Sequence, residues 1–209
     1  DLQALIKIEI TAHWKILFNG NGYTEDWVKE AEKRGLKNYR TTPDAIEHYL
    51  DKKNIDLFTR MQIYTPEEMK SHYDIKLEKY CQVLNIEVNT MIKMVNKDII
   101  PAAMKYMNVL ADTVYKMTKS WSGTSSVASK LLRSLDKLTA NLEIATDELT
   151  KQHEETKSIK DLLKASKSYE QDILPAMAKV RAVADQIEEL LGEEYKPFPS
   201  YEDLLFSVQ

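Results

Sequence analysis

The sequence predicts an all-α protein in which long, kinked antiparallel helices form a bundle preceded by several short helices. Glycine (5) and proline (6) are scarce in 209 residues, whereas β-rich and phosphate-cradling proteins use more glycine in turns. Apolar residues recur at steps of three and four over three long segments, which is the spacing of one helix face. The balance of 43% apolar and 30% charged residues is typical of a globular chain. A chain of this length can bury a substantial core.

Residues 1–18 are predicted to form the first helix. Residues 19–22 (Asn-Gly-Asn-Gly) should end it in a turn, because glycine reaches positive φ and asparagine tolerates it. The chain begins at Asp1 inside this periodicity and without an initiator methionine. We therefore expect a longer protein to extend upstream. The apolar face comes from Leu2, Ile6, Ile10, Trp14 and Leu17.

Further short helices are predicted up to residue 64. Thr24 is the expected N-cap of the second, and Gly35 stands where the glycine after a helix C-terminus belongs. Thr42 should begin the third, with Pro43 at the first helical position, where its missing N–H costs nothing. Residues 51–64 are interpreted as one more short helix and a connection.

A helix of about fifty residues, about 75 Å long, is predicted from residue 65 onward. Residues 65–68 (Thr-Pro-Glu-Glu) form a capping box with proline at the first position. The apolar steps behind it repeat as 4-4-3, close to the period of a straight helix. The positions are Met69, Tyr73, Leu77, Tyr80, Leu84, Val88, Met91, Val95, Ile99, Ala102, Tyr106 and Leu110.

Two more long helices should follow a loop at residues 120–126, and short connections favour an antiparallel bundle. Ser158 is the expected cap of the last helix, which should end at Gly192. The chain thus divides into an N-terminal helical segment (1–64), a bundle (65–192) and a tail (193–209). The seams have 3-4 spacing: Ala128, Leu131, Leu135, Leu138, Leu142, Ala145 and Leu149 on one helix, and Ile159, Leu162, Ser166, Tyr169, Ile173, Ala176, Val180, Val183, Ile187 and Leu190 on the other.

A short motif occurs twice in the bundle. Residues 98–102 (Asp-Ile-Ile-Pro-Ala) recur as residues 172–176 (Asp-Ile-Leu-Pro-Ala). Proline inside a helix lacks the donor N–H and kinks the helix. We therefore predict kinks at Pro101 and Pro175 that let two long helices bend together. Chance among common helix residues is the alternative.

Several classes of function are disfavoured by composition. Lys and Arg are spread along a chain of net charge −4, so no basic stripe favours nucleic acid. The apolar runs are too short to span a membrane. Cys81 is the single cysteine, which rules out an intrachain disulfide and fits a cytoplasmic protein.

No residue is nominated as catalytic, cofactor-binding or metal-binding. None of the four histidines, His13, His48, His72 and His153, stands in a Glu-x-x-His or His-Glu-x-x-His pair. Glu68 and His72 share one helix face but have no further ligand, and residues 47–48 and 153–155 are interpreted as exposed charge. Cys81 is expected to be a small buried apolar residue. Gly20 and Gly22 lack the strand and the lysine of a phosphate loop.

An ordered set of short motifs runs from one end of the chain to the other. It resembles the C-terminal region of type III glutamine synthetases and covers most of the chain, with residues 120–168 the least similar part. The motifs are residues 18–23 (Phe-Asn-Gly-Asn-Gly-Tyr), Trp27, 30–36 (Glu-Ala-Glu-Lys-Arg-Gly-Leu), 41–45 (Thr-Thr-Pro-Asp-Ala), 85–92 (Asn-Ile-Glu-Val-Asn-Thr-Met-Ile), 97–102 (Lys-Asp-Ile-Ile-Pro-Ala), 175–177 (Pro-Ala-Met), 181–185 (Arg-Ala-Val-Ala-Asp), 197–201 (Pro-Phe-Pro-Ser-Tyr) and 204–208 (Leu-Leu-Phe-Ser-Val).

The resemblance implies a parent enzyme that joins ammonia to glutamate while splitting ATP, with Mg or Mn as the divalent metal. In that family the residues for ATP, metal and glutamate lie upstream of this region, so none is carried over to this chain. The resemblance further implies that residues 1–64 pack on the catalytic body and that the parent is a homo-oligomeric ring. The fragment itself is then expected to be structural and inactive.

Two other functions remain open from the sequence. A free-standing helical module could bind a partner protein through apolar anchors, for which Trp14, Trp27, Trp121, Phe198 and Tyr201 are the candidates. A small-ligand or regulator site between the helices has only the analogy with other bundles behind it.

Overall fold

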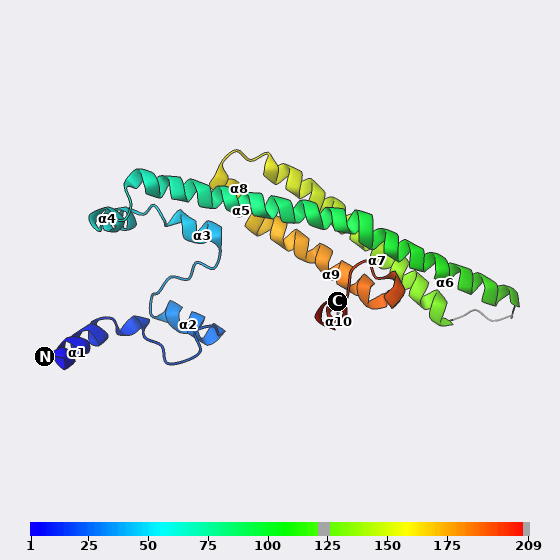
Figure 1. The fold of residues 1–209 in the computed structure, drawn as a ribbon, viewed down its shortest axis with the longest axis horizontal. Coiled ribbons are helices and arrows are strands. Elements are labelled where there is room, and N and C mark those ends of the chain that lie inside the picture. The colour runs from blue at the N-terminus through cyan, green and yellow to red at the C-terminus, as the bar shows by residue number, and fades with distance from the viewer. Residues whose placement is uncertain (121–125, 207–209) are drawn as a thin grey trace.

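The structure is a computed structural model that describes residues 1–120 and 126–206 (Figure 1). Every regular element in these ranges is a helix, and no strand occurs among them, so the predicted all-α class is confirmed. Three long helical rods lie side by side and run alternately in opposite directions (Figure 1). Short N-terminal helices lie at one end of the rods and beyond it.

The N-terminal segment contains α1 (Leu2–Ala12), the 3₁₀ turn η1 (Trp14–Ile16), α2 (Glu25–Lys33), α3 (Thr42–Glu47) and α4 (Lys52–Arg60). The first helix is therefore shorter than predicted, and a 3₁₀ turn follows it. Figure 1 shows α1 and α2 away from the rods, whereas α3 packs against α5 and α8 and α4 packs against α5. Lys167 Nζ lies 2.7 Å from Glu47 Oε2 and ties α3 to the bundle.

Local capping explains where these short helices begin and end. Thr24 is the N-cap of α2, as predicted, although its hydroxyl donates to Asn21 O and accepts no hydrogen bond from the N–H groups of the helix. Gly35 has φ of 74°, and Leu36 N–H donates to Ala31 O, so α2 ends in a Schellman motif.

Two details of the N-terminal predictions were wrong. Thr42 begins α3, as predicted, but Pro43 is the second residue of the helix and not the first, and Thr41 is the cap, since its Oγ1 accepts from Asp44 N–H at 3.3 Å. Of the glycines in the described residues, Gly35 is the one with positive φ, so the turn at residues 19–22 does not use left-handed glycines. Phe18 explains Gly20 instead, since a Cβ there would lie 2.6 Å from its ring.

The first rod is continuous from Pro66 to Ser120 through α5 (Pro66–Met94), the π-helical turn η2 (Val95–Ile99) and α6 (Ile100–Ser120). The predicted capping box is present: Glu68 N–H donates to Thr65 Oγ1 at 3.2 Å, and Thr65 N–H donates to Glu68 Oε2 at 2.7 Å. The predicted apolar stripe is buried or half-buried along its whole length.

The second rod is α7 (Ser126–Lys157), and the third consists of α8 (Leu162–Ser168), the π-helical turn η3 (Tyr169–Ile173) and α9 (Leu174–Leu190). The predicted cap at Ser158 is wrong. Asp161 caps α8 by accepting from Lys164 N–H at 2.8 Å, while the Ser158 hydroxyl donates to Glu155 O at 2.6 Å. The predicted loop lies mostly at residues 121–125, outside the described residues.

Each proline of the repeated motif follows a π-helical turn. Val95 O accepts from Ile100 N–H, and Tyr169 O accepts from Leu174 N–H. A proline ring would clash with the carbonyl four residues before it, and that residue lies inside the π-helical turn in both cases. The wider turn therefore accommodates Pro101 and Pro175 without ending either rod. The two motifs thus share a backbone geometry as well as a sequence.

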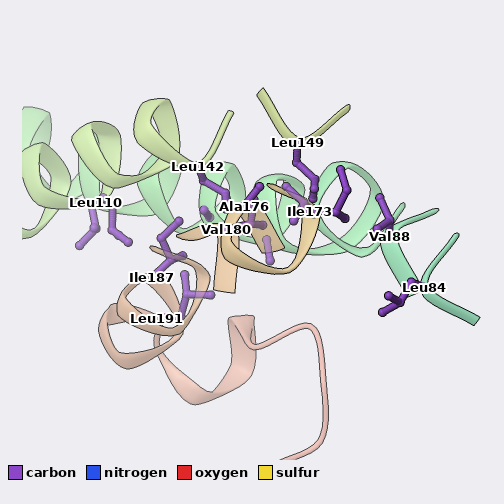
Figure 2. Close-up of a cluster of buried hydrophobic side chains, with 14 of the residues drawn as sticks. Leu84, Val88, Leu110, Leu142, Leu149, Ile173, Ala176, Val180, Ile187 and Leu191 are labelled. Carbon is purple, nitrogen blue, oxygen red and sulfur yellow. The ribbon is translucent and has the colours of Figure 1, made fainter. Parts of the chain in front are cut away.

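One apolar core joins the three rods. Figure 2 shows Leu142 and Leu149 pointing from α7 toward Ala176 and Ile173 on the third rod. Leu135, Leu142 and Leu149, every second position of the predicted seam, are each 0% exposed. Within the predicted seam of the third rod, Leu162 is the exception at 37% exposed. Burying one such leucine contributes about 1.5–3 kcal/mol.

The tail folds back onto the bundle through the 3₁₀ turn η4 (Glu193–Tyr195) and α10 (Tyr201–Phe206). The Tyr195 and Tyr106 rings lie 4.9 Å apart, which joins the tail to α6. Ser200 caps the start of α10: Asp203 Oδ2 accepts from Ser200 N–H at 2.8 Å, and Ser200 Oγ accepts from Asp203 N–H at 3.1 Å.

Replacing Leu142 by alanine should lower the free energy of unfolding by about 2–5 kcal/mol, because a fully buried side chain leaves a cavity. The control is Ile144→Ala on the same helix, where the residue is 66% exposed. That change should cost less than about 0.5 kcal/mol. Urea unfolding followed by circular dichroism measures both changes. Equal losses of unfolding free energy in the two variants would contradict the burial of Leu142 in the seam.

Candidate functional site

A pocket of 670 Å³ lies between the first rod, α9 and the tail. Its volume is within the range of about 300–1,000 Å³ that is typical of small-molecule sites. Most of its lining is apolar, and three methionines contribute to it. The lining residues are Ile86, Glu87, Thr90, Met91, Met94, Val95, Ile99, Met177, Val180, Arg181, Ala184, Asp185, Glu188, Leu191, Pro197, Phe198, Pro199 and Leu204.

The pocket has an apolar floor and a charged rim. Val95, Val180 and Leu191 are buried at 1%, 1% and 6% exposure and form its deepest part. The lining charges, three carboxylates and one guanidinium, belong to residues that are exposed. The apolar part can therefore hold an apolar body while a polar group stays at the mouth.

The guanidinium at this rim is already neutralised. Arg181 Nε lies 3.0 and 3.1 Å from the two carboxylate oxygens of Asp185. Among the described residues, neither Glu87 nor Glu188 has a salt-bridge partner. The pKa of Lys196 is raised chiefly by its hydrogen bond to Glu193, whose Oε2 lies 2.7 Å from Lys196 Nζ, and only in small part by the charge of Glu188. The rim therefore presents a net negative charge.

A second cluster of polar side chains is buried near the other end of the bundle. His153 is 1% exposed, and its Nε2 lies 3.0 Å from Asn85 Oδ1 on the first rod. The interpretation of residues 153–155 as exposed charge is therefore wrong for the histidine. It failed because α7 continues to Lys157 and keeps this position on its buried face.

The hydrogen bonds of this cluster fix the state of the imidazole. Asn89 Nδ2 donates to Asn85 Oδ1, so that oxygen is an acceptor and His153 Nε2 carries the donated proton. Burial lowers the pKa of His153 below its usual 6.5, Lys157 lowers the pKa further, and Glu154 opposes the shift. The histidine is thus held neutral as a structural donor between two rods.

Hydroxyl groups extend the buried polar cluster. Thr156 Oγ1 and Ser168 Oγ are 2.8 Å apart, and Ser168 Oγ donates to Asp172 Oδ2 at 2.9 Å. Because Thr156 is on α7 and Asp172 is in η3, this chain joins the second rod to the third. It satisfies polar groups that are costly to bury alone. We interpret these hydrogen bonds as a structural contact that fixes the alignment of the second and third rods, and we assign no catalytic role to them.

The remaining histidines have ordinary surface partners. His13 Nε2 lies 3.5 Å from Glu9, and His48 Nδ1 lies 3.2 Å from Asp51. The His72 ring packs 5.0 Å from the Tyr64 ring, while the Glu68 carboxylate is used in the capping box. Within residues 1–120 and 126–206 no three His, Cys, Asp or Glu side chains form a group that could hold a metal ion.

Cys81 is half-buried, and burial raises the pKa of its thiol. A raised pKa leaves less of the nucleophilic thiolate at neutral pH. Its Sγ lies 4.0 Å from Leu162 O on α8. Cys81 was predicted to be a small buried apolar residue; it is only half-buried, and its thiol faces a backbone carbonyl.

The candidate apolar anchors differ in their surroundings. Trp14 is 59% exposed, whereas Trp27 is half-buried with its ring 4.6 Å from Phe18 and 5.7 Å from the Arg34 guanidinium. Phe198 lines the pocket. Trp121 and the side chain of Tyr201 lie outside the described residues. No helix in the described part of the chain is long and apolar enough to cross a membrane.

Sequence reasoning did not find the pocket. Met91, Val95 and Ile99 were assigned to the apolar stripe of one helix. Apolar residues that line a pocket have the same spacing as residues that fill a core, so the spacing cannot distinguish the two. The available signal was the Pro-Phe-Pro motif at residues 197–199, which is too rigid and apolar for a free tail.

The chain is similar to the C-terminal part of known glutamine synthetases. The family described as the glutamine synthetase C-terminal domain matches residues 1–118. Glutamine synthetase of Butyrivibrio fibrisolvens is 35% identical over 209 residues, which is 100% of this chain and 30% of that protein. Type-3 glutamine synthetase of Dictyostelium discoideum is 29% identical over 208 residues, and glutamine synthetase of Bacteroides fragilis (strain YCH46) 26% over 208 residues; each match covers 97% of this chain and 28% of the relative.

The buried His153 should make the bundle sensitive to acid. Because its pKa is lowered in the folded state, the unfolded chain binds the proton more readily, so stability is present above about pH 6.5 and falls below it. His153→Gln should therefore reduce the loss of unfolding free energy on acidification. His13→Gln, at an exposed residue, is the control. Urea unfolding across this pH range measures it, and an unchanged slope would contradict the assignment.

Proposed function

Since the chain belongs to the glutamine synthetase C-terminal domain family, we propose that it is the helical C-terminal domain of a type III glutamine synthetase and that its role is structural. The chain spans 28–30% of the length of the relatives it matches. One of these relatives is a type-3 enzyme by name. The ligation of ammonia to glutamate with ATP is the activity that we assign to the longer parent.

The observation that carries this proposal is the exposure of α1: every residue of this helix is exposed, although most of its side chains are apolar. Gln3, Lys7 and Thr11 share one face of the helix, and the wide apolar surface around the rest is typical of a helix that packs on a larger body. A surface of this kind marks a contact with another part of a protein. Its exposed residues are Leu2 (72%), Leu5 (55%), Ile6 (47%), Ile8 (63%) and Ile10 (45%).

The segment after α1 is braced, which supports insertion of α1 as a unit. Arg34 Nη1 donates to Leu17 O at 2.7 Å and to Lys15 O at 3.3 Å, and Arg34 Nε donates to Glu30 Oε1 at 2.6 Å. Arg34, the residue directly after α2, thus fixes the end of η1. We propose that residues 1–64 pack on the catalytic body of the parent and that the bundle projects from it.

The parent's ATP and divalent metal belong to that body in our proposal. The described residues of this chain do not fit a metal, because no three potential ligands converge in them. We therefore assign no catalytic step to this chain. Its long rods would instead brace the body or shape contacts between subunits of a homo-oligomeric ring, in a cytoplasmic enzyme.

A free-standing interaction module is the competing function. The exposed tail helix favours it, since Leu204, Leu205 and Phe206 are 63%, 73% and 76% exposed. Exposed apolar residues at both ends suit a protein that binds a partner. The reading frame of the gene separates the two: a start near Asp1 favours the module, and an upstream catalytic region favours the synthetase domain.

The purified 209-residue chain should release no phosphate from ATP in the presence of glutamate and ammonium. The reason is that we assign the sites for ATP, metal and glutamate to the body of the longer parent. A phosphate-release assay with an intact glutamine synthetase as the positive control measures this. Glutamate-dependent turnover that co-purifies with the chain would overturn the structural role.

Changing Ile6 and Ile10 together to lysine should have opposite effects in the two contexts. In the 209-residue chain the unfolding free energy of the bundle should change by less than about 0.5 kcal/mol, because both residues are exposed. In the longer parent the same pair should abolish assembly or activity, since two charges would be buried.

Ile75→Lys is the matched control for that pair, at a residue 55% exposed on α5. It should be tolerated in both contexts. Denaturant unfolding of the short chain and size-exclusion chromatography with an activity assay of the long one supply the readouts. Normal assembly and activity of the parent with both lysines would contradict the proposed insertion of α1.

A further inference from the structure

We propose that the pocket between α5–η2, α9 and the tail is a binding site for a small molecule that has an apolar body and one cationic group. This inference concerns the 209-residue chain itself and does not depend on the parent's activity. It starts from the three walls of the pocket. The first rod supplies Met91 and Ile99, α9 supplies Met177 and Ala184, and the tail supplies Phe198.

The third wall is an ordered part of the structure. Residues 197–199 follow the Tyr195–Tyr106 ring contact of 4.9 Å, which joins the tail to α6, and precede Ser200, whose hydrogen bonds of 2.7 and 2.8 Å to Asp203 cap α10. Two prolines in three residues stiffen the span between this ring contact and α10. Gly192, where the tail leaves the rod, would place a Cβ 3.4 Å from Tyr195. The tail therefore completes a pocket with three sides.

The lining suits an apolar body of variable shape. Three methionine side chains, Met91, Met94 and Met177, lie in one pocket. Methionine is flexible and polarizable, so it adapts to different apolar surfaces. The one neutral polar side chain in the lining, Thr90, already donates its hydroxyl to Ile86 O at 2.8 Å. The interior thus offers mainly apolar contact.

The rim selects the charge of the occupant. Glu87 belongs to the first rod and Glu188 to α9, so carboxylates stand on two facing walls of the pocket. Arg181, the lining cation, is held by both oxygens of Asp185. An amine or other cation at the mouth would gain the attraction of the two free carboxylates, and an anion would be repelled by them.

A titration of methionine methyl signals tests this site. The 209-residue chain is labelled with ¹³C at the methionine methyl groups and titrated with 4-phenylbutylamine or with 4-phenylbutanoate, which share an apolar body and differ in charge. The amine should shift the signals of Met91, Met94 and Met177 with a millimolar Kd, as expected for so small a ligand. The signals of Met61 and Met117, which do not line the pocket, should stay unchanged.

The acid should bind about tenfold more weakly than the amine, because of the two rim carboxylates. Glu87→Gln with Glu188→Gln should remove this preference. Glu143→Gln with Glu155→Gln, at exposed residues that do not line the pocket, removes the same two charges and should leave it intact. Ala184→Phe should fill the pocket and weaken binding of both probes, with circular dichroism confirming the fold.

Three results would overturn the proposal. The first is no shift of the three methyl signals by the amine, and the second is equal binding of the amine and the acid. The third is a shift of the same signals on raising the protein concentration without a probe, which would mean that a second copy occupies the pocket.

Discussion

The fold depends on the apolar seam of α7, which is buried between two neighbouring rods. Leu135, Leu142 and Leu149 recur every seven residues and are each 0% exposed. They meet the first rod through α6 and the third rod through α9, so removing the middle rod would expose both of the others. With seam leucines each contributing about 1.5–3 kcal/mol, this one helix accounts for a large part of the core.

The polar groups at one end of the seam set the register of the rods. An apolar heptad tolerates slippage by a turn, because each leucine would find another leucine. His153 does not tolerate it, since its imidazole is buried and would lose Asn85 as its partner after such a shift. Thr156 and Ser168 impose the same constraint between the second and third rods. The apolar seam supplies stability, and the polar end specifies the alignment.

Much of the fold could be predicted because it follows from local signals. The capping box at Thr65, the Gly35 terminus and the seams of all three rods depend on spacing alone. The burial of His153 could not be predicted, because it depends on how far α7 extends beyond its apolar seam and on Asn85, 68 residues earlier. The cap at Asp161 was missed because Ser158 is as good a capping residue by type.

The candidate pocket depends on the backbone geometry that the repeated motif produces. Val95 and Ile99 are the first and last residues of η2, and both line the pocket. A regular α-helix has a narrower turn, so the same two side chains would stand at a different angle around the rod. Pro101 blocks the regular hydrogen bond at this point and thereby favours the wider turn.

The matching turn before Pro175 lies at a different place, where Tyr169 packs near His153 and Asp172 accepts from Ser168. The same motif thus produces a π-helical turn twice, but the surroundings of the two turns differ. In η2 the wider turn leaves space beside the rod, and in η3 polar side chains and an aromatic ring fill it. The difference comes from the neighbouring helix: α7 covers η3, whereas the tail leaves η2 only partly covered.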